Sequence, residues 1–172
     1  MKKRILFISN VDWFFVSHRL NIGLEAISQG YEVHLATKFI DNEKILSEYG
    51  FVLHPIEIDR TKKDALNFLK NFIAIFKIIK KVKPDLVHSV TIKPVILGGI
   101  ASKILNNIPF VASISGLGYV FISKNKGSLI VKKIIETLYK FALSNKYIKV
   151  IFQNSEDQRI LQKICNLTVK DV

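Results

Sequence analysis

Hydrophobic positions along the chain fall into two alternating kinds of segment. Short runs rich in Val, Ile, Leu and Phe, bounded by Gly, Pro, Asn or Asp, predict β-strands. Longer stretches in which apolar residues recur every three or four positions predict α-helices. The predicted strands cover residues 4–9, 31–37, 51–58, 85–90, 109–115 and 147–153, and the predicted helices lie near 17–29, 42–49, 64–82, 94–106, 128–146 and 155–165.

This regular alternation predicts the fold class. Several strands are apolar on consecutive residues, as in Ile5 to Ile8, which is typical of strands covered on both faces of a parallel sheet. Strand and helix in alternation indicate βαβ units with right-handed crossovers. We therefore expect an α/β, Rossmann-like three-layer domain with a mainly parallel sheet of about six strands. The pattern has no repeat or linker, so residues 1–172 are expected to form a single domain.

In such a sheet, ligands bind beyond the carboxyl ends of the strands. The first of these loops, residues 9–17, lacks the G-x-G-x-x-G pattern of NAD and FAD sites and the G-x-x-x-x-G-K-[ST] pattern of a P-loop. The four histidines are scattered and the single cysteine cannot build a zinc site, so neither a metal nor a cofactor is expected. No G-x-S-x-G elbow of a serine hydrolase is present.

The first loop instead offers polar and aromatic side chains. Asn10 follows the first strand, and three aromatic residues occupy 13–15. The aromatic rings either pack against the core or form an apolar lip beside the site. His18 is either the neighbour of a helix cap or a polar group that points into the cleft.

The loops after the later strands hold the other candidates. Lys93 lies before a helix whose first amide groups favour anions, so it either binds a phosphate or pyrophosphate or is a solvated surface lysine. His88 lies within a strand and is either a hydrogen-bonded core histidine or a ligand. After the fifth strand, Gly116 and Gly118 allow the backbone to approach a ligand closely. Ser115 and Tyr119 flank these glycines, and Asn154 follows the sixth strand as a predicted helix cap.

The charge of the chain adds an attraction to anions. Its formal net charge is +12, from 26 Lys and Arg against 14 Asp and Glu. The segment 62–83 has an apolar arc of about 200°, where packing on a sheet needs little more than 100°. This segment and 128–146 are either crossover helices with solvated lysines or a surface that lies on an anionic membrane. Because no RNP motif, zinc finger or helix-turn-helix is evident, nucleic acid is not an expected partner.

Cysteine usage and hydropathy indicate the compartment. Cys165 is the single cysteine, so no internal disulfide can form and a reducing compartment is expected. The chain shows no secretory signal and no apolar run long enough to span a bilayer. We expect a soluble protein, or one that lies on a membrane without crossing it.

Four motifs in order carry a family resemblance. They are SNVDWFFVSHRLNIGLEAISQGYEVHLAT, KPDLVHSVTIKPVILGGIASKI, ISGLGYVF and VIFQNSEDQRIL. Over residues 3–167 the chain resembles the amino-terminal domain of GT-B glycosyltransferases of family 4, in the bacterial branch that builds capsule, O-antigen and lipid-linked glycans.

The resemblance implies half of an enzyme. In that family the amino-terminal Rossmann-like domain binds the acceptor, often a polyprenyl-pyrophosphate-linked sugar at the inner face of the cytoplasmic membrane. A carboxy-terminal domain, absent from these 172 residues, binds the nucleotide sugar. Transfer usually retains the anomeric configuration and needs no metal. The isolated domain is expected to be inactive. The alternative is a non-catalytic membrane-associated subunit that recruits a separate donor-binding protein.

The resemblance also collects the candidate residues into one cleft. Many relatives carry a histidine after the fifth strand, where this chain has Ser115, so the catalytic residue is unassigned and His18 and Ser115 are its candidates. The expected substrate-binding residues are Asn10, His18, Lys93, Ser115, Gly116, Gly118, Tyr119 and Asn154.

Overall fold

The strands of this computed structural model form one parallel sheet, as expected. The structure describes residues 2–58, 65–117, 126–168 and 170–172. The six strands are ordered β3-β2-β1-β4-β5-β6, and all neighbours are parallel. The strands are β1 (Arg4–Val11), β2 (Glu32–Lys38), β3 (Val52–Pro55), β4 (Leu86–Val90), β5 (Phe110–Ile114) and β6 (Ile148–Phe152). The helices are α1 (Asp12–Ser28), α2 (Glu43–Glu48), α3 (Ala65–Val82), α4 (Ile92–Ile104), α5 (Lys126–Ala142) and α6 (Ser155–Cys165).

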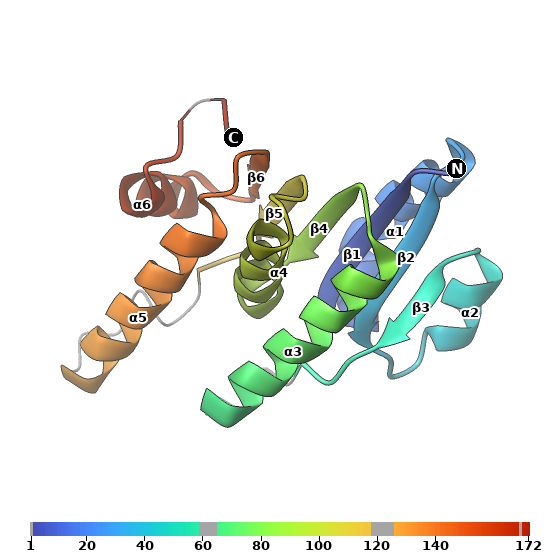
Figure 1. Cartoon of the computed structure of the whole chain (residues 1–172), viewed down its shortest axis with the longest axis horizontal. Coiled ribbons are helices and arrows are strands. Elements are labelled where there is room, and N and C mark those ends of the chain that lie inside the picture. The colour runs from blue at the N-terminus through green and yellow to red at the C-terminus, as the bar shows by residue number, and fades with distance from the viewer. Residues whose placement is uncertain (1, 59–64, 118–125, 169) are drawn as a thin grey trace.

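Helices cover both faces of this sheet (Figure 1). Helix α1 packs on β1 and β2, where Phe7, Phe15 and Phe51 form a small aromatic core. Helices α3, α4 and α5 lie on the opposite face and enclose the larger core, which includes Leu97 and Tyr139. The α/β three-layer architecture predicted from the sequence is therefore confirmed.

Two glycines hold α4 close to its neighbours. A Cβ added at Gly98 would lie 2.4 Å from Ser89 Oγ on β4, and one added at Gly99 would lie 2.8 Å from the carbonyl oxygen of Ala142 on α5. No side chain fits at either distance, so the backbone of α4 packs directly against β4 and α5 at these two glycines. This contact fixes where the first turn of α4 stands relative to the end of β4.

The structure corrects the first predicted loop. Strand β1 runs to Val11 and α1 begins at Asp12, so the aromatic residues lie in the first turn of a helix rather than in a loop. Phe15 is fully buried, Phe14 is half-buried and Trp13 is 48% exposed. Packing against the core thus accounts for Phe15, and an exposed apolar side chain remains at Trp13.

Each edge of the sheet has a feature that limits pairing with a further strand. At the β6 edge, the amide of Val150 donates to the carbonyl oxygen of Asp171 at 2.6 Å, so the last residues run beside the outermost strand. At the other edge, β3 has four residues and ends at Pro55. Across the described part of the chain, no helix has both the length and the apolar character needed to cross a bilayer.

Candidate functional site at the carboxyl ends of β1, β4 and β5

The strand order reverses between β1 and β4, which is where sheets of this kind have their ligand crevice. The chain proceeds from β1 to β2 and β3 on one side and to β4, β5 and β6 on the other. Connections that diverge in this way leave an opening beyond the carboxyl ends of the two central strands. Ile8 pairs with Ser89, so Asn10 and Thr91 follow at the same level two residues later. Val90 pairs with Ser113, which brings Ser115 beside the start of α4.

Three polar side chains at this edge lack partners. Asn10 is 4% exposed, and its Oδ1 atom has no hydrogen bond among the described residues. The same holds for Thr91 Oγ1 and Ser115 Oγ, both shielded from solvent. Unsatisfied buried polar groups are costly, about 1–3 kcal/mol each, and rare in native proteins. Other buried polar atoms without a partner in the described chain lie elsewhere, such as Ser102 Oγ and the Tyr139 hydroxyl, but these three share one edge of the sheet, where a polar ligand could reach them together.

Thr91 also has a strained backbone. Its φ is +74° and its ψ is +165°, in a region that is almost reserved for glycine. The strain is held by two hydrogen bonds: the Thr91 amide donates to the Ser113 carbonyl at 3.2 Å, and the Thr91 carbonyl accepts from the Val95 amide at 3.0 Å. A conformation that costs on the order of 1–3 kcal/mol typically marks a functional position.

Lys93 stands in the first turn of α4. The sequence placed this lysine in a loop, but α4 already begins at Ile92, and the Lys93 side chain is half-buried. The first amide groups of a helix have no intrahelical acceptor and favour an anion. Lys93 and the start of α4 therefore bring positive charge to the same edge as Thr91.

Arg19 adds a second positive group that sequence reasoning missed. Its Nη1 donates to the carbonyl oxygen of His18 at 2.8 Å. Its Nε is buried without a partner in the described part of the chain. An arginine two turns into a helix gives no sequence signal of a site, because its proximity to β4 exists only in the folded chain.

His88 is a hydrogen-bonded core histidine, one of the two alternatives left by the sequence. Its Nε2 lies 2.8 Å from Ser113 Oγ, and its ring lies 5.0 Å from that of Phe7. Burial, and then the nearby charge of Arg19, lower the pKa of His88 to about 4. The imidazole is therefore neutral near pH 7. It is buried near enough to Arg19 for the charge of Arg19 to lower its pKa.

His18 lies on the solvent-exposed side of α1. Its ring stacks on Phe14 with centroids 4.2 Å apart, and its Nδ1 lies 2.7 Å from Ser17 Oγ. These contacts are all within its own helix. The structure thus does not join His18 to the group formed by Asn10, Thr91 and Ser115, and its role as a catalytic or binding residue stays a prediction.

Gly116 turns the chain directly after Ser115. Its φ is +93°, and a Cβ built on it would meet no atom of the described residues within 4 Å. The next amide, of Leu117, donates to Asp157 Oδ1 at 3.3 Å, which ties this turn to the start of α6. The predicted site residues Gly118 and Tyr119 lie outside the described residues.

Asn154 caps α6, as its sequence context predicted. Its Oδ1 accepts from the Asp157 amide and its Nδ2 donates to Asp157 Oδ2, both at 2.8 Å. Both polar atoms of the side chain thus have structural partners. Substrate binding by Asn154 stays a prediction.

Asp12 shows how a neighbouring carboxylate is used structurally. It is fully buried and accepts hydrogen bonds from the amides of Trp13, Ile40, Asp41 and Asn42, at 2.7 to 3.0 Å. Burial raises the pKa of Asp12, but the four amide donors outweigh it and leave the pKa below its usual value. Asp12 therefore fastens the segment after β2 to the start of α1.

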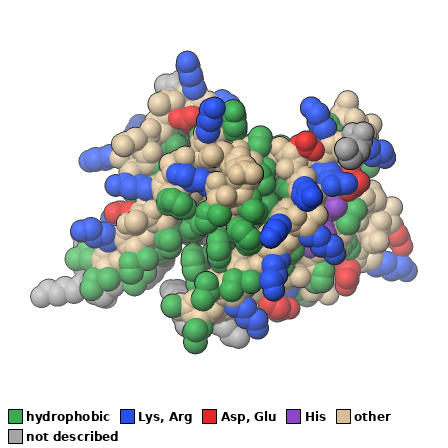
Figure 2. Space-filling view, in the orientation of Figure 1, with side chains coloured by type: hydrophobic (Ala, Val, Ile, Leu, Met, Phe, Trp, Pro, Cys, Tyr) green, Lys and Arg blue, Asp and Glu red, His purple; other side chains and the backbone are tan. Residues whose placement is uncertain are grey.

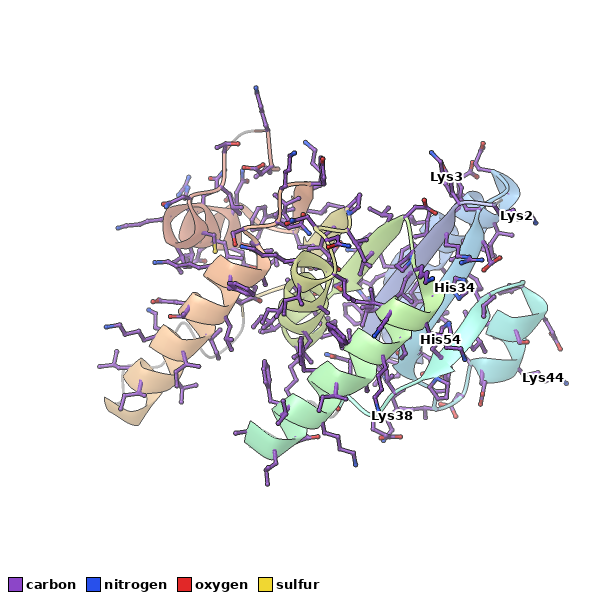
Figure 3. The ribbon with its side chains drawn as sticks, viewed as in Figure 1. Lys2, Lys3, His34, Lys38, Lys44 and His54 are labelled. Atoms are coloured by element: carbon purple, nitrogen blue, oxygen red, sulfur yellow. The ribbon has the colours of Figure 1, made fainter. Side chains whose placement is uncertain are left out.

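A second polar cluster lies on the other side of β1. His34 Nδ1 is 2.9 Å from His54 Nε2, and His34 Nε2 is 2.7 Å from Glu32 Oε1 (Figure 3). Burial, and then His34 and Lys81, lower the pKa of His54. Both ring nitrogens of His34 thus have a partner, one in His54 and one in Glu32. Among the described residues, no cluster of three or more His, Cys, Asp or Glu suits a metal ion.

The fold and the crevice define a class: a Rossmann-like α/β domain that presents polar side chains at the switch between β1 and β4. Residues 4–154 match the model of the Glycosyl transferase 4-like family, so the chain belongs to that family.

A curated relative agrees with this assignment. The chain is 30% identical over 127 residues to N,N'-diacetylbacillosaminyl-diphospho-undecaprenol alpha-1,3-N-acetylgalactosaminyltransferase of Campylobacter jejuni, a match that covers 70% of this chain. The chain spans 34% of that relative's length.

The solved structures share the fold at low identity. A glycosyltransferase from Rickettsia africae has a TM-score of 0.67 and 17% identity, over 99% of this chain and 41% of that one. UDP-N-acetylglucosamine 2-epimerase from Rickettsia bellii has a TM-score of 0.62 and 15% identity, over 99% of this chain and 44% of that one. An epimerase among these structures shows that the fold alone does not specify the reaction.

Proposed function

We propose that this domain binds the acceptor of a retaining glycosyltransferase whose nucleotide sugar is held by a second domain. The observation that carries the proposal is the group of polar side chains at the switch between β1 and β4. There Asn10, Thr91 and Ser115 leave buried polar atoms without partners, in a chain of the Glycosyl transferase 4-like family. Amide and hydroxyl groups of this kind are suited to the hydroxyl groups of a sugar.

The acceptor belongs to the class of sugars linked through a diphosphate to a lipid. The name of the Campylobacter jejuni relative gives such an acceptor, a sugar on diphospho-undecaprenol. Two features of this chain suit the diphosphate: Arg19 with its unpartnered Nε, and Lys93 at the start of α4. The sugar then lies over Asn10 and Ser115, beside Gly116.

The contribution of this domain to catalysis is positioning and electrostatics. Holding the acceptor hydroxyl against the anomeric carbon converts a bimolecular reaction into an effectively unimolecular one. Positive groups fixed before the reaction need no reorganisation as charge develops. His18 and Ser115 remain the candidates for a direct catalytic role, and the domain alone is expected to transfer no sugar.

Binding measured on the 172-residue chain tests the proposal. A water-soluble acceptor analogue, a sugar diphosphate with a short prenyl chain, is expected to shift the NMR amide signals of Thr91, Ser115 and Gly116. UDP-sugars are expected to leave these signals in place. Sugar transfer by the isolated chain, or binding of UDP-sugar and not of the acceptor analogue at these residues, would overturn the proposal.

A further inference from the structure

The first half of α3 exposes large apolar side chains. Leu66 is 82% exposed, Leu69 53% and Ile73 44%, whereas the buried residues Ile75 and Ile79 lie further along the helix. At 100° per residue, the three exposed side chains share one arc that faces away from the sheet. The wide apolar arc predicted from the sequence is thus left partly open to solvent.

The first half of α5 repeats this arrangement. Leu129, Ile130, Val131 and Ile134 are between 47% and 68% exposed, and burial begins only near Tyr139. Helices α3 and α5 each follow a strand of the same parallel sheet, so both begin at its carboxyl edge. Figure 1 shows their first turns projecting from the same side of the molecule, and Figure 2 shows hydrophobic side chains gathered over both ends.

Lysines follow the apolar residues along the same helices. On α3, Lys77 and Lys80 continue the exposed arc of Leu66 and Ile73. Lys77 lies about 6 Å beyond Ile73 along the helix axis, and Lys80 about 21 Å beyond Leu66. On α5, Lys133 flanks Ile130 and Ile134. Together α3 and α5 contain eight lysines and one acidic residue, which amounts to +7 of the chain's net charge of +12.

We propose that the first turns of α3 and α5 dock on an anionic lipid bilayer. Leu66, Leu69, Ile130 and Ile134 enter the headgroup region, and Lys77, Lys80 and Lys133 contact the lipid phosphates. The net charge of both helices is positive, which complements an anionic surface. Apolar residues at projecting helix ends with lysines behind them form a two-level arrangement that matches the interface between acyl chains and headgroups.

This docking stands independently of the proposed acceptor binding, but it would serve it. The crevice and the two helix ends lie at the same edge of the sheet. A lipid-linked diphosphate sugar would therefore reach Thr91 and Lys93 without leaving the membrane surface.

Vesicle flotation with the full 172-residue chain tests the proposal. We expect binding to an equal mixture of phosphatidylcholine and phosphatidylglycerol at low salt, weaker binding at high salt, and little binding to phosphatidylcholine alone. Leu66→Ser with Ile130→Ser is expected to lower the partition coefficient about tenfold or more. The matched control, Ile40→Ser with Ile104→Ser, removes two large apolar residues elsewhere that are 54% and 53% exposed, and it should bind like the wild type.

The lysines are tested by a parallel pair of variants. Lys77→Gln with Lys80→Gln is expected to weaken binding several-fold at low salt. Lys44→Gln, on α2 (Figure 3), with Lys163→Gln, on α6, removes the same charge from other surfaces and should have little effect. Equal losses in both pairs would indicate attraction to the net charge alone and would overturn docking through this surface.

A fluorescent reporter tests insertion directly. Trp13 is the single tryptophan, so Trp13→Phe with Leu69→Trp places one reporter on α3. A blue shift and quenching by brominated lipid are expected, and an unchanged spectrum would reject insertion.

If sedimentation instead shows a dimer that the Leu66→Ser and Ile130→Ser variant abolishes, without vesicle binding, the surface joins two copies of the chain and the proposal fails. Loss of vesicle binding while the acceptor analogue still shifts Thr91 would reject the docking and leave the proposed function intact.

Discussion

Asp12 and Asn10 are two residues apart, yet the structure treats their polar groups in opposite ways. The Asp12 carboxylate accepts four amide hydrogen bonds, whereas Asn10 Oδ1 accepts none among the described residues. Both side chains are buried. The difference separates a group whose partners are in the chain, and which holds the fold, from one that has no partner in the described part of the chain.

Asp12→Ala is the substitution expected to have the largest effect on stability, and it tests whether Asp12 holds the fold. The substitution removes a charge-assisted acceptor and leaves four amides unpaired, so we expect the free energy of unfolding to fall by about 3 kcal/mol or more. Urea denaturation measures the change. The matched variant Asn10→Ala should cost less than about 1 kcal/mol, and equal losses in the two variants would remove the distinction.

Acid should act on the satisfied groups in two separate pH ranges. The pKa of His88 is lowered from 6.5 to about 4. As the pH falls from 6.5 to 4, the unfolded chain therefore takes up a proton before the folded chain does, and stability falls by roughly 3 kcal/mol. The pKa of Asp12 is also lowered, so its contribution is present at neutral pH and is lost below about pH 4. Denaturation curves measured at several pH values give the free energy of unfolding. Its dependence on pH between 6.5 and 4 should be weaker in His88→Gln than in the wild type.

Ser115→Ala tests the unsatisfied side of the comparison. Because Ser115 Oγ has no partner among the described residues, its removal should change the free energy of unfolding by less than about 0.5 kcal/mol. Binding of the acceptor analogue should weaken about tenfold, the value of one hydrogen bond of about 1.4 kcal/mol. Calorimetric titration with the analogue gives the affinity. A variant that binds normally would show that the hydroxyl faces no ligand.

Thr91→Gly should change stability modestly and in the opposite direction. Glycine adopts a φ of +74° without strain, so we expect a gain of about 1 kcal/mol after its greater flexibility in the unfolded chain is counted. Acceptor binding should weaken at the same time, because the hydroxyl is lost. Thermal unfolding measures the gain, and a variant less stable than the wild type would contradict the strain.

The sequence predicted the parts of the fold that depend on local pattern. All six strands and six helices lie where the periodicity placed them, with shifts at their ends. The largest shift is at the start of α1, because Asp12 is held by the amides of residues 40–42, which come close only after β1 and β2 have paired. A contact of this kind leaves no trace in the first loop's own sequence.

The site was predicted less completely than the fold, for a related reason. The rule that ligands bind beyond the carboxyl ends of the strands selected Asn10, Lys93 and Ser115, and the structure places all three at that edge. It did not single out Thr91 or Arg19. The strain at Thr91 depends on backbone torsion angles. The position of Arg19 depends on how α1 packs on the sheet and brings its charge near His88, and neither is encoded in residue type or spacing.

The strip of chain beside β6 has a consequence for handling the protein. A bare outer strand offers free amide and carbonyl groups on which a second molecule can add, and fibrous aggregates grow by that route. In this protein the hydrogen bond from Val150 to Asp171 covers part of the β6 edge. At the opposite edge, β3 has only four residues and ends in a proline, so it is a poor template for a further strand. Shortening the chain before Asp171 would therefore be expected to promote self-association even though no residue of the crevice is touched.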